Sequence, residues 1–197
     1  PYITENPHNV TREQFSDFVK QLFDEIRQMR GELIEIHEHH FLRYVLEYFG
    51  IKLSISIEEA EWIISTTLGD NIMTPDANKM LKALTEKGIK TGIISNLCWS
   101  GNALERVMAE LFPEHKFEFI MTSSEYIFRK PDRHLFDLAV RKSGFKAEEI
   151  WYCGNFIDVD VIGANNAGLF PVLYDNSDIY DRFHKLNDIS KIDFPFH

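Results

Sequence analysis

The sequence predicts an α/β protein in which a helical unit precedes a parallel, doubly wound sheet flanked by helices. Apolar side chains recur at helical spacing through residues 11–70, which predicts helices there. From residue 74 onward, short apolar runs alternate with helical patterns, which is typical of βαβ units and a parallel sheet. Polar residues follow several of these runs directly, at the strand ends where open α/β sheets bind their ligands.

Length, composition and net charge limit the class of protein to which the chain can belong. The chain has 197 residues, of which 44% are hydrophobic, enough for a globular domain with a sizeable core. A formal net charge of −10 argues against a nucleic-acid partner, because binding nucleic acid requires a basic surface. The chain shows no signal-peptide pattern and no apolar run near about 18 residues, so we expect a cytoplasmic protein without a membrane partner. The oligomeric state is left open.

Three helices are expected in the first part of the chain. The first begins at Thr11 with a capping box and ends at Gly31. The second runs to about Gly50, and the third starts after a cap at Ser56. Residues 1–10 are predicted to form at best an ordered entry to the first helix.

The second part of the chain is expected to alternate helices with strands. The predicted helices run from Thr74-Pro75 to Gly88, over 102–111, over 132–143, up to Gly168 and over 179–186. The predicted strands lie between and after them, at 89–96, at 117–123, from Ile150 and at 170–174. A loop is expected at 126–131. The strand that begins at Ile150 is a continuous apolar run of the kind that a buried parallel strand shows.

Three strand ends carry polar side chains, and on a doubly wound sheet these ends would share one edge. They are Ser95 and Asn96, then Lys130 before Pro131, then Asn155, Asp158 and Asp160. A hydroxyl with backbone N–H groups, an ammonium group and hard oxygen ligands suit a phosphoryl group together with Mg²⁺. Each signal alone is weak, because a Ser after a strand is usually a helix cap and a Lys before Pro is usually solvated. The prediction therefore depends on the order and spacing of the three groups of residues, and not on any one of them.

Three segments resemble the second, third and fourth motifs of the haloacid dehalogenase (HAD) superfamily. They are Gly-Ile-Ile-Ser-Asn at 92–96, Arg-Lys-Pro-Asp at 129–132 and Gly-Asn-Phe-Ile-Asp-Val-Asp at 154–160. Most members are Mg²⁺-dependent phosphohydrolases on a Rossmann-like core, so the resemblance implies that fold and a small phosphorylated substrate. Residues 11–70 resemble the α-helical cap of one class of these enzymes. We therefore assign residues 1–72 to a cap and residues 73–197 to a partial core.

The resemblance also implies roles for individual residues. Ser95 and the backbone of Asn96 would bind phosphate, and Lys130 would stabilise the charge on the nucleophile and the phosphoryl group. Asp160, together with Asn155, would hold Mg²⁺. Asn155 stands where the family has an Asp, and a neutral oxygen ligand is expected to bind Mg²⁺ less tightly.

The first motif of the family has no counterpart in the sequence. That motif is an apolar strand ending in Asp-x-Asp, whose first Asp forms an aspartyl-phosphate, and the cap normally follows it. We therefore expect the sheet to lack its central strand and the nucleophile to come from sequence outside these residues. On its own, the chain is not expected to hydrolyse phosphate esters.

Two other functions remain as alternatives. A catalytically inactive HAD-like binding protein is one, and Asn155 favours it. A metal-free haloacid dehalogenase is the other, ranked lower: in that enzyme the Asn falls three residues before the motif's Asp, whereas Asn155 lies five before Asp160. Asn155 and Asp158 do have the three-residue interval, but the following Gly163-Ala164 aligns Asp160 with the motif.

Two further groups of residues are interpreted conservatively. Metal ligands on one helix are typically spaced i, i+4. The run from His37 to His40 does not have this spacing, so we interpret the run as a solvated helix face. Glu35 and His39 do have that spacing, and we expect the pair to support the helix. Arg129 is either a second phosphate contact or a surface charge.

Overall fold

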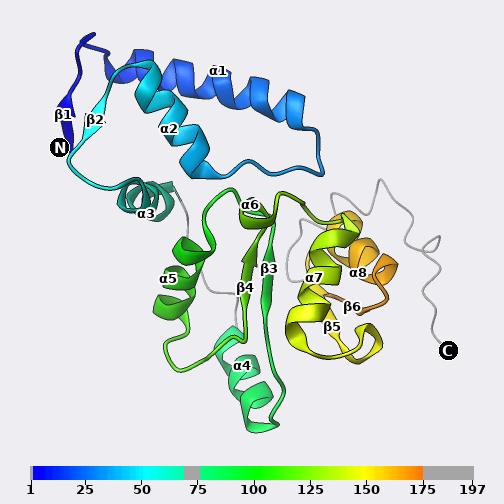
Figure 1. Ribbon diagram of the computed structural model, residues 1–197. Coiled ribbons are helices and arrows are strands. Elements are labelled where there is room, and N and C mark those ends of the chain that lie inside the picture. The colour runs from blue at the N-terminus through cyan, green and yellow to red at the C-terminus, as the bar shows by residue number, and fades with distance from the viewer. Residues whose placement is uncertain (1, 69–75, 175–197) are drawn as a thin grey trace.

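The computed structural model describes residues 2–68 and 76–174 (Figure 1). It confirms a mixed α/β protein with parallel strands. The predicted helix at 179–186, the helix start at Thr74-Pro75 and the division between residues 72 and 73 lie outside the described residues. Within the described part, no helix is both long enough and apolar enough to cross a membrane.

The first part consists of three helices and a short antiparallel ladder. Its elements are β1 (Ile3–Glu5), α1 (Arg12–Arg30), α2 (Glu38–Tyr48), β2 (Lys52–Leu53) and α3 (Ile57–Leu68). The predicted caps are present, since Thr11 forms a capping box and the Ser56 hydroxyl accepts a hydrogen bond from the Glu59 N–H at 3.2 Å. The pairing of β1 with β2 was not predicted, because strands of three and two residues are too short to show a period-two pattern.

The second part alternates helices and strands as expected. Its elements are α4 (Ala77–Glu86), β3 (Ile93–Ser95), α5 (Gly101–Leu111), β4 (Ile120–Thr122), α6 (Ser123–Tyr126), α7 (Arg133–Ser143), the 3₁₀ turn η1 (Ala147–Glu149), β5 (Trp151–Gly154), the π-helical turn η2 (Ile157–Val161), α8 (Ile162–Asn166) and β6 (Phe170–Leu173). Figure 1 shows α2 and α3 above the carboxyl ends of β3 and β4, which point toward α6.

The strands of the second part form two separate parallel pairs. β3 pairs with β4, with Ser95 opposite Thr122, and β5 pairs with β6. No ladder joins the two pairs among the described strands. The predicted strands at 89–96 and 117–123 were too long, because an apolar run marks burial and not the presence of a pairing partner.

Helix α7 lies at the centre of the packing and contributes to two apolar clusters. Phe136 packs with residues of α8 and the turn after it, and Leu135 packs with Met121 of β4. The prediction of a buried strand at Ile150 was partly wrong, because side chains of β5 alternate between exposed and half-buried. Trp151 is 73% exposed and lies against Phe170 of the neighbouring strand, with ring centroids 5.0 Å apart.

Candidate functional site

A buried ion pair between Lys130 and Asp160 forms the centre of the site. The Lys130 Nζ lies 2.7 Å from Asp160 Oδ1, and both side chains are buried. Asp160 Oδ2 accepts hydrogen bonds from the backbone N–H groups of Asn155 and Phe156, each at 3.1 Å. The turn can approach this closely because residue 154 is Gly: a Cβ there would lie 2.6 Å from Asp160 Oδ2. Asp160 therefore contacts Lys130, which lies 30 residues earlier in the chain.

The Lys130 ammonium group lies between the two strand pairs. It donates hydrogen bonds to the Ile94 carbonyl of β3 at 3.3 Å and to the Tyr152 hydroxyl of β5 at 2.7 Å. The Tyr152 hydroxyl in turn donates to Asp160 Oδ1 at 3.2 Å. Burial, followed by the charge of Asp160, raises the pKa of Tyr152 above its usual range, so this hydroxyl keeps its proton. The Lys130 ammonium group is therefore held at a fixed position beside the end of β3, with its three N–H groups donated and its charge offset by Asp160.

Ser95 and Asn96 lie at the end of β3, beside Lys130. The Ser95 hydroxyl is half-buried and makes no hydrogen bond with any residue that the structure describes. The Asn96 side chain binds the backbone of Lys130 twice, donating to its C=O at 2.8 Å and accepting from its N–H at 2.7 Å. Asn96 therefore holds the loop that carries Lys130 against β3, while no described residue occupies the Ser95 hydroxyl.

The oxygen ligands expected to hold Mg²⁺ differ in how available they are. Each carboxylate oxygen of Asp160 already accepts two hydrogen bonds, which uses its lone pairs. The side chains of Asn155 and Asp158 are exposed and have no partner in the described part of the chain. Mg²⁺ prefers carboxylate and phosphate oxygens in octahedral geometry. The three residues alone do not complete such a site. Asp160 would also have to give up a hydrogen bond in order to bind the metal.

A cavity of about 300 Å³ opens beside this site, between the first two helices and the ends of the strands. Arg27 and Arg30 of α1 line it together with Arg129, and the acidic side chains are Glu35 and Glu38. Its remaining lining comes from apolar residues of α1, of α2 and of the segment between them, and from the turn at 96–98 after β3. A pocket of this size suits a small molecule. The guanidinium groups of Arg27 and Arg30 favour an anionic one, because Arg129 is paired with Glu35.

Glu35 connects the first part of the chain to the loop before Lys130. It is buried, pairs with the guanidinium group of Arg129, and accepts a hydrogen bond from the Ser123 hydroxyl at 2.9 Å. The expected helical pair of Glu35 with His39 was wrong, because Glu35 precedes α2 and faces Arg129 instead. No local pattern could show this partner, which lies 94 residues away.

Cys98 also lines the cavity but is not an activated nucleophile. Burial, together with the nearby charges of Glu38 and Glu35, raises the pKa of its thiol to about 12. The thiolate is the nucleophilic form of Cys, so this side chain is unreactive near neutral pH.

Comparison with known proteins gives the family. The family model for haloacid dehalogenase-like hydrolases matches residues 9–173. The chain belongs to this family. This confirms the resemblance seen in the sequence, and the arrangement of helices and parallel strands agrees with the Rossmann-like core of these hydrolases.

Named relatives of this hydrolase family match parts of the chain. A glyceraldehyde 3-phosphate phosphatase of Methanothermobacter thermautotrophicus is 34% identical over 101 residues, which cover 50% of this chain and 43% of that protein. A ribulose-1,5-bisphosphate 5-phosphatase of Halopiger xanaduensis is 26% identical over 179 residues, 88% of this chain and 73% of that protein. The match to the first relative thus spans less than half of that protein's length.

Solved structures of the family share the fold. A HAD family enzyme from Bacteroides thetaiotaomicron has a TM-score of 0.53 at 16% identity, covering 95% of this chain and 94% of that one. A HAD phosphatase from Thermococcus onnurineus has a TM-score of 0.51 at 18% identity, covering 89% and 79%.

Proposed function

We propose that this chain carries the phosphate-binding and substrate-binding parts of a phosphatase that acts on a small sugar phosphate. The observation that carries the proposal is the buried ammonium group of Lys130 beside the hydroxyl of Ser95, which has no partner among the described residues, at the end of β3. Phosphoryl transfer requires charge neutralisation and hydrogen-bond donors fixed in advance around the phosphoryl oxygens. Both are present at one edge of the strands.

Each side chain has a separate task in this proposal. The Ser95 hydroxyl donates a hydrogen bond to a phosphoryl oxygen, together with backbone N–H groups at Asn96. The Lys130 ammonium group offsets the negative charge of the phosphoryl group and of the attacking carboxylate. Asp160 and Tyr152 hold Lys130 in place and take no part in bond making.

The nucleophile in this proposal is an aspartate from a segment outside residues 1–197, on a strand between β3 and β5. Among the described strands, β3 pairs only with β4 and β5 only with β6, while Lys130 contacts both inner strands. The carboxylate oxygen would attack phosphorus as the bond from phosphorus to the substrate oxygen breaks, and that oxygen would leave as the alcohol after taking a proton from water. A water molecule would then attack the aspartyl-phosphate, which releases inorganic phosphate and restores the carboxylate.

Mg²⁺ dependence is part of the proposal and rests on the family. When bound, the ion would add positive charge at the phosphoryl oxygens. The exposed side-chain oxygens of Asn155 and Asp158 accept no hydrogen bond from the described residues and would be free to bind the ion. Further carboxylate oxygens would come from the segment that carries the nucleophile.

The cavity and the relatives support a sugar phosphate as substrate. Two relatives are named as phosphatases of glyceraldehyde 3-phosphate and of ribulose 1,5-bisphosphate. A triose or pentose phosphate matches a cavity of about 300 Å³, with Arg27 and Arg30 as its anion contacts. Residues 1–72 act as the cap, since α1 and α2 form one wall of this cavity.

The test uses the protein isolated from its native source, with each variant introduced into the native gene and isolated in the same way. Its intact mass is compared with the 23.1 kDa of this chain, and phosphate release is measured with glyceraldehyde 3-phosphate and ribulose 1,5-bisphosphate, with and without Mg²⁺. Ser95→Ala should lower turnover about 10²-fold, as expected for one lost donor to a developing charge. Lys116→Ala is the matched control, since Lys116 is exposed near the opposite ends of the strands.

The same experiment separates the alternatives. A mass of 23.1 kDa with no phosphate release from any substrate would favour an inactive binding protein, as Asn155 suggests. Halide release from a 2-haloacid without metal would indicate a dehalogenase. Equal activity of Ser95→Ala and Lys116→Ala would refute the assignment of the phosphate site.

A further inference from the structure

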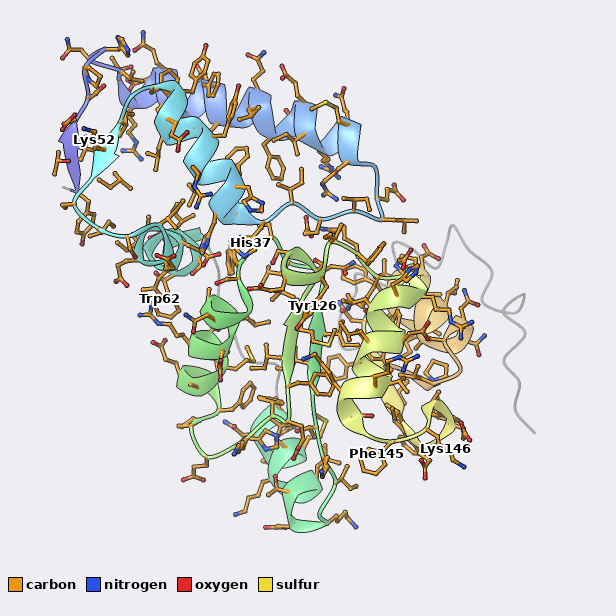
Figure 2. All side chains as sticks on the ribbon, in the orientation of Figure 1. His37, Lys52, Trp62, Tyr126, Phe145 and Lys146 are labelled. Carbon is orange, nitrogen blue, oxygen red and sulfur yellow. The ribbon has the colours of Figure 1, made fainter. Side chains whose placement is uncertain are left out.

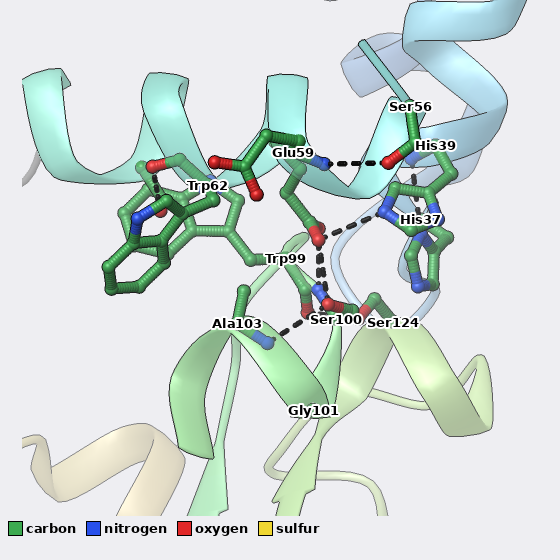
Figure 3. Close-up of polar contacts among 12 residues, drawn as sticks. His37, His39, Ser56, Glu59, Trp62, Trp99, Ser100, Gly101, Ala103 and Ser124 are labelled. Carbon is green, nitrogen blue, oxygen red and sulfur yellow. Dashed lines mark hydrogen bonds and ion pairs between the residues drawn. The ribbon is translucent and has the colours of Figure 1, made fainter. Parts of the chain in front are cut away.

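A second cluster of polar side chains lies where α2 and α3 meet the start of α5, apart from Lys130. It consists of Glu61 on α3 and two histidines that Figure 3 labels, His37 at the N-cap of α2 and His39 in its first turn. One possible ligand atom from each residue lies within 4.8 Å of the other two. Figure 2 shows His37 at this boundary between the helices of the first part and the strands of the second.

Glu61 is the most constrained member of the cluster. Its side chain is 1% exposed, and its Oε2 atom lies 2.9 Å from His39 Nε2. Ser100 holds both carboxylate oxygens, donating from its N–H to Oε1 and from its hydroxyl to Oε2, each at 2.7 Å. Metal-binding carboxylates are characteristically oriented by such hydrogen bonds from a second layer of residues. This carboxylate is buried, oriented and directed at an imidazole nitrogen.

The ring nitrogens of the two histidines differ in protonation. His39 Nε2 donates its proton to the Glu61 carboxylate, and this proton has to leave before the nitrogen can bind a metal. His37 Nδ1 accepts a hydrogen bond from the His39 N–H at 3.1 Å, so this nitrogen carries no proton, and its lone pair becomes available to a metal when that hydrogen bond opens. On the other side of the ring, His37 Nε2 lies 3.7 Å from Glu125 Oε1. A carboxylate at this position is the common partner of a metal-bound histidine, whose second N–H it accepts. Glu125 is itself oriented by the N–H of Gly101 at 2.9 Å.

We propose that His37, His39 and Glu61 bind one divalent transition-metal ion, with Zn²⁺ the best match, at the junction of α2, α3 and α5. Two imidazoles and one carboxylate suit Zn²⁺, whereas Mg²⁺ prefers oxygen ligands alone. A water molecule would take the fourth position of the tetrahedron. The ion would tie α2, which lines the cavity, to α3 and to the N-cap of α5.

The rearrangement needed for binding is small. Ligand atoms of a tetrahedral zinc lie about 3.3 Å apart, given bonds of about 2.0–2.1 Å. The three ligand atoms therefore have to approach from separations of up to 4.8 Å, while the contact between His39 and Glu61 opens slightly from 2.9 Å. The metal would replace two hydrogen bonds, the one between those side chains and the one from the His39 N–H to His37.

The experiment is a calorimetric titration of the full chain with Zn²⁺, in excess Mg²⁺ to occupy sites made of oxygen ligands only. We expect one Zn²⁺ per chain, with binding weakened at least tenfold by His37→Gln and by His39→Gln. His40→Gln is the matched control, because His40 is exposed on the same helix and lies outside the cluster. Co²⁺ in place of Zn²⁺ should give the intense visible absorption of a tetrahedral site, and both cluster variants should lose it.

Several results would overturn the proposal. These are no Zn²⁺ binding, binding unchanged by both histidine variants, or an equal loss in His40→Gln, which would indicate adventitious surface binding. Glu61→Gln removes a buried carboxylate and risks unfolding, so the decision rests on the half-buried His37 and His39, with circular dichroism confirming that each variant folds. Zn²⁺ should also raise the melting temperature of the parent and leave that of His39→Gln unchanged.

Discussion

Replacing Asp160 by Asn should strongly destabilise the protein. The amide keeps the shape of the side chain but offers one acceptor oxygen in place of two, so an NH₂ group would face either the Lys130 ammonium group or two backbone N–H groups. The Lys130 charge would remain buried without its counter-ion. Breaking a buried ion pair from one side costs about 3–5 kcal/mol. Against a total free energy of unfolding of about 5–15 kcal/mol, that is a large share.

Urea unfolding followed by circular dichroism measures this loss. With a slope of about 2 kcal/mol per molar urea, the midpoint should fall by about 1.5–2.5 M while the slope stays constant. The matched control is Asp137→Asn, which breaks the exposed pair of Asp137 with Arg133 on α7. A surface pair of this kind contributes about 0.3–0.5 kcal/mol, so the control midpoint should hardly move.

A double-mutant cycle shows whether the ion pair is the cause. Lys130→Met removes the ammonium group, so combining it with Asp160→Asn should cost less than the sum of the two single changes. The reasoning is refuted if Asp160→Asn costs no more than Asp137→Asn, or if the effects of the two changes at the ion pair are simply additive.

Three further changes test other parts of the structure. Gly154→Ala should cost about 1–3 kcal/mol, because a Cβ would overlap the Asp160 side chain, and an unchanged urea midpoint would contradict that close approach. Thr11→Ala should cost about 0.5–2 kcal/mol by removing the capping box of α1, and a smaller loss in the same assay would mean that the box is not formed in solution. With a pKa of about 12, the Cys98 thiol is ionised to about one part in ten thousand at pH 8. Its alkylation rate should therefore rise about tenfold per pH unit from pH 7 to 10, and a plateau near pH 9 would show that the pKa is not raised.

The helices could be predicted closely because their signals are local. The capping box at Thr11 fixes where α1 begins, and Gly168, with φ of +81°, follows α8 where a residue with positive φ is needed. Strands were predicted less well, because an apolar run does not reveal which part of it finds a partner. Residues 89–96 satisfied the pattern, yet only Ile93–Ser95 pair with β4.

The candidate site was predictable where it depends on parallel strands, and not where it depends on long-range partners. Carboxyl ends of parallel strands share an edge, which is why Ser95 and Lys130 could be expected together. The contact between Glu35 and Arg129 gave no local signal. For the histidines, spacing along a single helix was the wrong criterion, since Glu61 on another helix supplies the third side chain of the cluster.

The double hydrogen bond between Asn96 and Lys130 limits which residues position 96 can tolerate. The side chain has to donate and accept at the same moment, at fixed places on one peptide unit. An Asp would lose the donor, and a Ser has one oxygen for two separated partners, so an unsatisfied backbone group would follow in each case. The amide of Lys130 lies outside any helix or strand, yet it should exchange its hydrogen as slowly as amides within the sheet. Slow exchange at this single position would identify the loop as a rigid extension of β3.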